Sequence, residues 1–78
     1  MDDDKRAHIA DELTSRELEI VNLIARGKTN QQIADQLLIA FETVKWYLKQ
    51  IYGKLHVSNR AQAVAAAHAA GLLELELG

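Results

Sequence analysis

The segment TNQQIADQLLIAFETVKWYLKQIYGKL, residues 29–55, decides the fold, because it holds two helical repeats of apolar residues with a short break between them. Steps of four, three and four residues separate the apolar positions of the second repeat. This spacing predicts one buried face on a helix from about Phe41 to Leu55. The first repeat predicts a shorter helix, which Thr29 or Asn30 can cap, with Gln32 completing a capping box. The positions predicted to face the core are Ile33, Ala34, Leu37, Val44, Leu48, Ile51 and Leu55.

A further helix is predicted before this segment, in LTSRELEIVNLIARG, residues 13–27. Thr14 is a good N-cap, and Glu17 three residues later can close a capping box. Leu13 can pack on Leu18 as a hydrophobic staple. Gly27 can end the helix, because glycine enters the left-handed conformation at little cost. The inward-facing stripe predicted for this helix is Leu18, Val21, Ile24 and Ala25.

A last helix is predicted in HVSNRAQAVAAAHAAGLL, residues 56–73, with Ser58 or Asn59 as its cap and Gly71 at its end. Its predicted inward-facing residues are Ala63, Val64 and Ala67. The remaining alanines form a smooth outer face, which either suits close contact with a partner or reflects only the helix propensity of alanine. The outer residues are Ala61, Ala65, Ala69 and Ala70.

These patterns predict an all-α fold, a four-helix domain with a central helix-turn-helix, over residues 13–73. The chain has 78 residues, of which 49% are apolar, enough for one domain with a modest core. We interpret residues 1–12 as a charged leader, either an added sequence or the end of a linker, and residues 74–78 as a tail.

The charge of the chain is distributed unevenly. The net charge is −2, yet the stretch from Lys28 to Arg60 holds five basic residues against two acidic ones. This local excess is either an ordinary solvated surface or the binding face for an anion. On the helix from Phe41 to Leu55, Lys45 and Lys49 lie one turn apart on the face opposite the apolar stripe, with Trp46 beside them.

Several classes of function find no support in the composition. The chain has no cysteine, which excludes disulfides and thiolate chemistry, and no apolar run approaches the roughly 18 residues of a membrane span. The three histidines, His8, His56 and His68, lack metal-ligand spacing. No catalytic constellation or phosphate-binding glycine loop is visible. We therefore expect no enzyme activity, no cofactor, no metal and no membrane partner.

The helix-turn-helix pattern has a physical use. A helix with its side chains fits the major groove of B-form DNA, about 12 Å wide, while the preceding helix crosses the phosphate backbone. The inserted helix needs a buried stripe that holds it and an outer face of long side chains. The predicted helix from Phe41 to Leu55 has both, although many small helical bundles also carry an amphipathic helix with two lysines.

Three longer motifs stand in order along the chain: LTSRELEIVNLIARGKTNQQIADQL, ETVKWYLKQIYGKL and VSNRAQAV. With them, the span from Leu13 to Leu73 closely resembles the LuxR-type (GerE-like) DNA-binding domain, and most resembles that of the large MalT-like regulators. The resemblance implies sequence-specific binding of double-stranded DNA by the C-terminal domain of a cytoplasmic bacterial transcription regulator. It also implies a homodimer formed through the fourth helix. RNA polymerase is a further candidate partner.

The resemblance also implies roles for individual residues. Base edges and nearby phosphates would face Lys45, Trp46 and Lys49. Phosphates would be contacted by Lys28, Thr29, Asn30, Gln31, Thr43, Tyr47 and Arg60. For Arg60 the alternative is an ion pair with an acid such as Glu17 within the fold. Dimerisation would use Ala61, Ala65, His68 and Ala69.

The sequence departs from the family pattern in the turn, within the third helix and just after it. Leu38 stands where the turn usually carries glycine, and Ala40 stands where serine is usual, which removes a helix cap and a phosphate donor. Tyr47 replaces a common histidine. His56 occupies a position where glycine is frequent and where a positive φ is expected.

Two alternatives stay open at this point. In the first, Trp46 and the alanine face form a docking surface of a protein-interaction module. In the second, the chain contacts RNA polymerase at promoters, as does the similar domain of sigma factors.

Overall fold

A computed structural model describes residues 12–73, and the fold is stated for these residues alone. They contain four helices: α2 (Ser15–Ala25), α3 (Asn30–Leu37), α4 (Phe41–Leu55) and α5 (Arg60–Ala69). No strand occurs among residues 12–73, so the predicted all-α class and the order of the helices are confirmed. The predicted tail at 74–78, and the predicted leader up to residue 11, lie outside the described residues.

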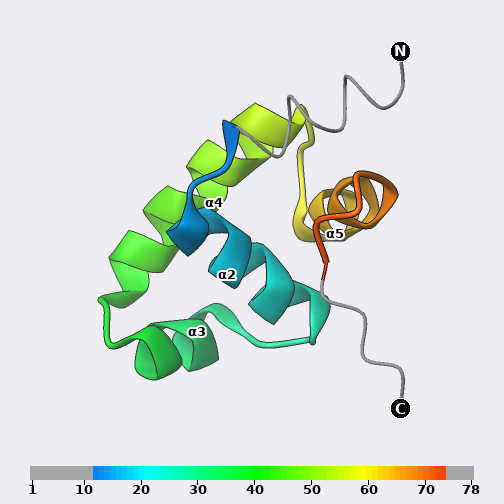
Figure 1. Cartoon of the computed structure of the whole chain (residues 1–78). Coiled ribbons are helices and arrows are strands. Elements are labelled where there is room, and N and C mark those ends of the chain that lie inside the picture. Colours follow the sequence, from blue (N-terminus) through cyan, green and yellow to red (C-terminus); the bar gives the residue numbers. More distant parts are fainter. Residues whose placement is uncertain (1–11, 74–78) are drawn as a thin grey trace.

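The helices surround one core. Figure 1 shows α4 along one flank, α2 in the middle, and α3 and α5 beside α2. α4 contacts each of the other three helices, and α2 also contacts α5. Ala34 of α3 is 2% exposed and belongs to this core. The predicted stripe of α4 is buried throughout: Val44, Leu48, Ile51 and Leu55.

The buried face of α2 differs from the predicted stripe. Ala25 is exposed, so its assignment to the core is wrong, and Leu18 is only partly buried. Ile20 and Leu23 are buried instead, together with Val21 and Ile24. The reason is that α2 packs against both α4 and α5, so its buried face is wider than a single stripe. On α5, Ala63 and Ala67 are fully buried, while Val64 is partly buried.

Side-chain caps fix the start of three helices. Thr14 and Thr29 each form a complete capping box, the first with Glu17 and the second with Gln32. At α5 the cap is Asn59, whose side chain accepts from the backbone N–H of Gln62 at 2.9 Å. Each cap satisfies an amide that the helix itself leaves unpaired, so the chain enters these helices at defined residues.

A residue in the left-handed backbone conformation follows each of the four helices. Gly27 and Gly71 follow α2 and α5 with positive φ, as the sequence predicted. Leu38 and His56 take the same conformation after α3 and α4, each with φ of 58°. The backbone N–H of Ile39 donates to Ala34, so the chain turns sharply between the two helices despite the missing glycine.

Candidate nucleic-acid interface

The outer face of α4 carries the long side chains that the sequence placed there. Lys45, Trp46 and Lys49 are all exposed, and Trp46 keeps 56% of its surface in contact with solvent. Val44, on the other side of the same turn, is completely buried. The helix is therefore held by one face and free on the other, as insertion into a groove requires.

Lys45 has two neighbours on the first turn of α4. Its Nζ lies 3.6 Å from Oε2 of Glu42 and 5.8 Å from the centre of the Phe41 ring. Both contacts are in exposed positions, where an ion pair contributes little and separates easily. The side chain of Lys45 thus makes only weak contacts and stays largely exposed to solvent.

Trp46 and Tyr47 contact each other edge to face, with ring centres 5.1 Å apart and planes at 73°. Tyr47 is partly buried and packs against the core, which anchors the pair. The indole of Trp46 is therefore supported from one side while its remaining surface faces solvent. Thr43, one turn before Tyr47, is half-buried.

The predicted phosphate-contacting residues at the start of α3 lie together. Gly27, Lys28, Thr29, Asn30 and Gln31 line one hollow of the surface with Phe41 and Arg60. Thr29 and Gln31 are exposed, and the amide of Gln31 donates to Asp35 at 2.9 Å. The hollow therefore joins the beginning of α3 to the beginning of α4.

Arg60 connects α5 to this hollow. Its guanidinium donates to the backbone oxygen of Lys28 at 2.9 Å and to the side-chain oxygen of Asn30. Arg60 therefore bonds within the fold, but to Lys28 and Asn30 rather than to an acid such as Glu17, which pairs with another residue. Arg60 fixes the loop before α3 and thereby positions the residues of the hollow.

The partner of Glu17 is Lys54, whose Nζ lies 2.7 Å from Oε1 of the carboxylate. Glu17 is only 3% exposed and also accepts from the backbone N–H of Thr14. Burial by itself raises the pKa of the Glu17 carboxyl, but the bonds from Lys54 and Thr14 outweigh it, so this pKa lies below its ordinary value of 4.5. The sequence assigned Glu17 to the capping box and gave no signal for a partner 37 residues away.

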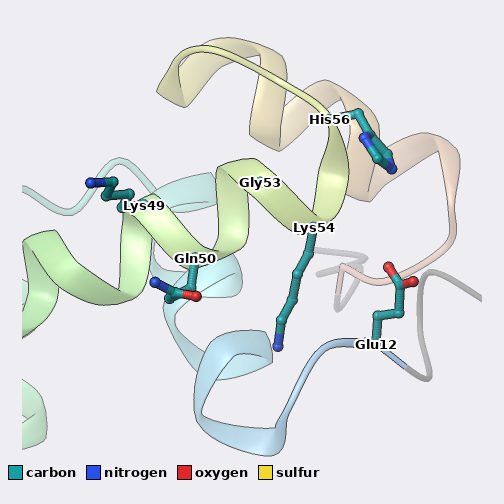
Figure 2. Close-up of a pocket in the computed structure, with 6 residues that line it drawn as sticks. All are labelled: Glu12, Lys49, Gln50, Gly53, Lys54 and His56. Carbon is teal, nitrogen blue, oxygen red and sulfur yellow. The ribbon is translucent and has the colours of Figure 1, made fainter.

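A second hollow runs along the C-terminal half of α4 and is lined by Glu12, Lys49, Gln50, Gly53, Lys54 and His56. Figure 2 shows Lys54 extending from α4 toward α2, whereas Lys49 points away from that side. Lys54 thus forms an ion pair within the domain. Lys49 is the lysine of this half of α4 that stays exposed on the outer face. No group of three or more possible metal ligands occurs within residues 12–73.

The family model for bacterial regulatory proteins of the luxR family, GerE, matches residues 11–67. The chain belongs to the LuxR family. Among curated relatives, it is 54% identical over 56 residues to the transcriptional regulatory protein LiaR of Bacillus subtilis. It is 44% identical over 70 residues to the response regulator protein VraR of Staphylococcus aureus, and 43% identical over 61 residues to the HTH-type transcriptional regulator AlkS of Alcanivorax borkumensis.

These relatives are longer than the LuxR-family segment that they share with this chain. The matches cover 72%, 90% and 78% of this chain but 26%, 34% and 7% of LiaR, VraR and AlkS, respectively. Among solved structures, the transcription factor GerE has a TM-score of 0.77 and 38% identity, covering 82% of this chain and 96% of that one. The response regulator ChrA of a heme-sensing two-component system has a TM-score of 0.76 and 43% identity, and the match covers 77% of this chain and 30% of that one.

The last helix of this LuxR-family domain leaves one face open. The residues predicted for dimerisation, Ala61, Ala65, His68 and Ala69, are all exposed, whereas Ala63 and Ala67 are buried against α2 and α4.

No helix of the described part, residues 12–73, is long and apolar enough to cross a bilayer.

Proposed function

We propose that this LuxR-family domain binds double-stranded DNA in a sequence-specific manner and serves transcription regulation in the cytoplasm. The observation that carries the proposal is the two-faced α4, with a stripe buried from Val44 to Leu55 and with Lys45, Trp46 and Lys49 exposed opposite it. In this proposal α4 enters the major groove. The two ammonium groups donate to guanine O6 or N7 or to phosphates, and the indole contacts a thymine methyl or a sugar.

The start of α3 would hold the phosphate backbone. Helix N-termini attract anions, and Lys28, Thr29, Asn30 and Gln31 surround this one. Thr43 and Tyr47 would add hydroxyl donors from α4. Arg60 would act first by fixing Lys28 and Asn30, with any further contact to phosphate made by the donors that these two bonds leave free.

A homodimer through α5 fits this function. The exposed residues Ala61, Ala65, His68 and Ala69 form a face of mostly small side chains that a second copy can approach closely. Two domains related by a two-fold axis would contact two half-sites about one helical turn of DNA apart. A single module with few cations releases few counterions, so one domain alone would bind weakly.

Selection of preferred duplexes from a random pool tests the proposal, with the 78-residue chain as bait at low salt. We expect enrichment of one sequence, and of two copies at a fixed spacing if the chain pairs on DNA. A pool that stays unenriched would overturn the proposal. The alternative of a protein-docking module would gain if, in addition, a protein partner bound equally well to the Lys45→Ala and Lys49→Ala variants.

A further inference from the structure

One residue of the exposed face of α4 has no place in the proposed contacts. Glu42 is the only acidic residue of the helix, and its side chain is 80% exposed. It lies in the first turn, three residues before Lys45 and four before Trp46, so all three project from the same side. A carboxylate here would enter the major groove together with the residues that read bases.

A negative charge at this place works against DNA binding in general. It repels phosphates, and its oxygens only accept hydrogen bonds, so they also repel guanine O6 and N7 and thymine O4. The amino groups of cytosine and adenine are the donors that the major groove offers. Adenine presents its amino group next to the acceptor N7, which suits an amide, whereas a carboxylate suits the cytosine N4 amino group.

The geometry of the Glu42–Lys45 pair fits one base pair. In a G·C pair, cytosine N4 and guanine O6 are themselves hydrogen-bonded, so a donor and an acceptor lie about 3 Å apart at the groove. Oε2 of Glu42 and Nζ of Lys45 are an acceptor and a donor 3.6 Å apart. Their mutual contact is weak in solvent and can be exchanged for contacts to the two bases.

We infer that Glu42 is a specificity-determining residue, which accepts a hydrogen bond from cytosine N4 while Lys45 donates to the guanine of the same base pair. This inference rests on the proposed function. Where the duplex lacks that base pair, Glu42 stays paired with Lys45 and lowers affinity for the site. The competing explanation for the carboxylate at this position is a purely structural role, because the positive end of the helix dipole stabilises a negative charge in the first turn.

The random-pool selection, repeated with Glu42→Gln and Glu19→Gln, separates these roles. Glu19 is the matched control, since it lies on α2, is exposed and forms a similar i,i+3 ion pair with Arg16 at 3.7 Å. Both variants lose one negative charge. We expect Glu42→Gln to replace the preference for cytosine by one for adenine at a single position, because a glutamine amide pairs with adenine N6 and N7. This variant should bind the duplex selected by wild type roughly tenfold more weakly than the same duplex with adenine at that position.

The outcomes are distinct. If Glu42→Gln selects the same sequence as wild type with the same discrimination at every position, the inference is overturned and the DNA-binding proposal stands. If wild type itself selects no sequence, both are overturned. A change of preference in Glu19→Gln equal to that in Glu42→Gln would also overturn the inference, because net charge alone would then explain it. Thermal melts of both variants confirm that each is folded in the selection buffer.

Discussion

Nζ of Lys54 lies 2.7 Å from Oε1 of Glu17, so the last turn of α4 is tied to the first turn of α2 by an ion pair whose carboxylate is buried. The same carboxylate closes the capping box of Thr14. One residue thus fixes both the start of α2 and the position of α4 relative to it. The pair leaves Lys45 and Lys49 as the lysines of α4 at the exposed face.

The stability of the domain should depend on Glu17 in acid. Its pKa in the folded protein lies below 4.5, so the carboxylate contributes fully above that pH, and the contribution is lost as the pH falls through the folded pKa. We expect Glu17→Gln to lower the free energy of unfolding by about 2 kcal/mol at pH 7. The difference from wild type should shrink steadily below pH 4.5 in urea titrations. Glu19→Gln controls for the lost charge, and a constant difference for Glu17→Gln at every pH would contradict the account.

Leu38→Gly should stabilise the turn between α3 and α4. Leu38 has φ of 58° and is 90% exposed, so it pays the steric cost of the left-handed region without a packing gain. After the entropy cost of glycine, we expect a gain of about 0.5–1 kcal/mol in the free energy of unfolding. Leu38→Ala, which keeps the Cβ, should show no such gain. A glycine variant less stable than wild type would mean that Leu38 makes a stabilising contact.

Ala40→Ser should strengthen the start of α4. Ala40 is the N-cap and provides no side-chain hydrogen bond, in contrast to Thr14, Thr29 and Asn59 at the other helices. The backbone N–H of Thr43, the position that the other caps bind, donates at 3.0 Å to the backbone oxygen of Ala40 instead. A serine hydroxyl would offer this amide a second acceptor in place of that carbonyl, and we expect about 0.5–1 kcal/mol of added stability by chemical denaturation. Thr29→Ala is the reciprocal control and should lose a similar amount. An unchanged Ala40→Ser variant would show that the carbonyl of Ala40 serves the amide of Thr43 as well as a hydroxyl would.

Arg60→Lys should loosen the loop before α3. A lysine cannot reproduce the planar fork that donates to both Lys28 and Asn30, so we expect a loss of about 1 kcal/mol in stability. Arg16→Lys on α2 controls for the substitution itself and should change stability by less than about 0.5 kcal/mol. Equal stability of Arg60→Lys and wild type would mean that these two hydrogen bonds are dispensable.

Local patterns in the sequence were enough for the helices, their caps and the exposed face of α4. The reason is that apolar spacing, capping boxes and glycine stops act within a few residues of one another. The pairing of Glu17 with Lys54 and of Arg60 with Lys28 could not be predicted, because both link residues more than 30 positions apart. The buried face of α2 was misjudged for a related reason, since its width depends on which helices pack against it.

The roles of single residues on DNA stay predictions. Exposure on α4 is a property of one helix, which the sequence encodes, whereas a base contact depends on a second molecule. The positions of Lys45, Trp46 and Lys49 satisfy the geometric requirement that the proposal makes of them. The hollow at the start of α3 satisfies the corresponding requirement for the phosphate contacts.

The most direct test of the central claim is the salt dependence of duplex binding, measured by fluorescence anisotropy for wild type, Lys45→Ala, Lys49→Ala and the control Arg16→Ala. We expect wild-type affinity to fall as salt rises, with the slope of log K against log salt reduced by about 1 in each α4 variant and unchanged in Arg16→Ala. Binding in both α4 variants that equals wild type at every salt concentration, or no binding of any duplex by wild type at low salt, would contradict the claim.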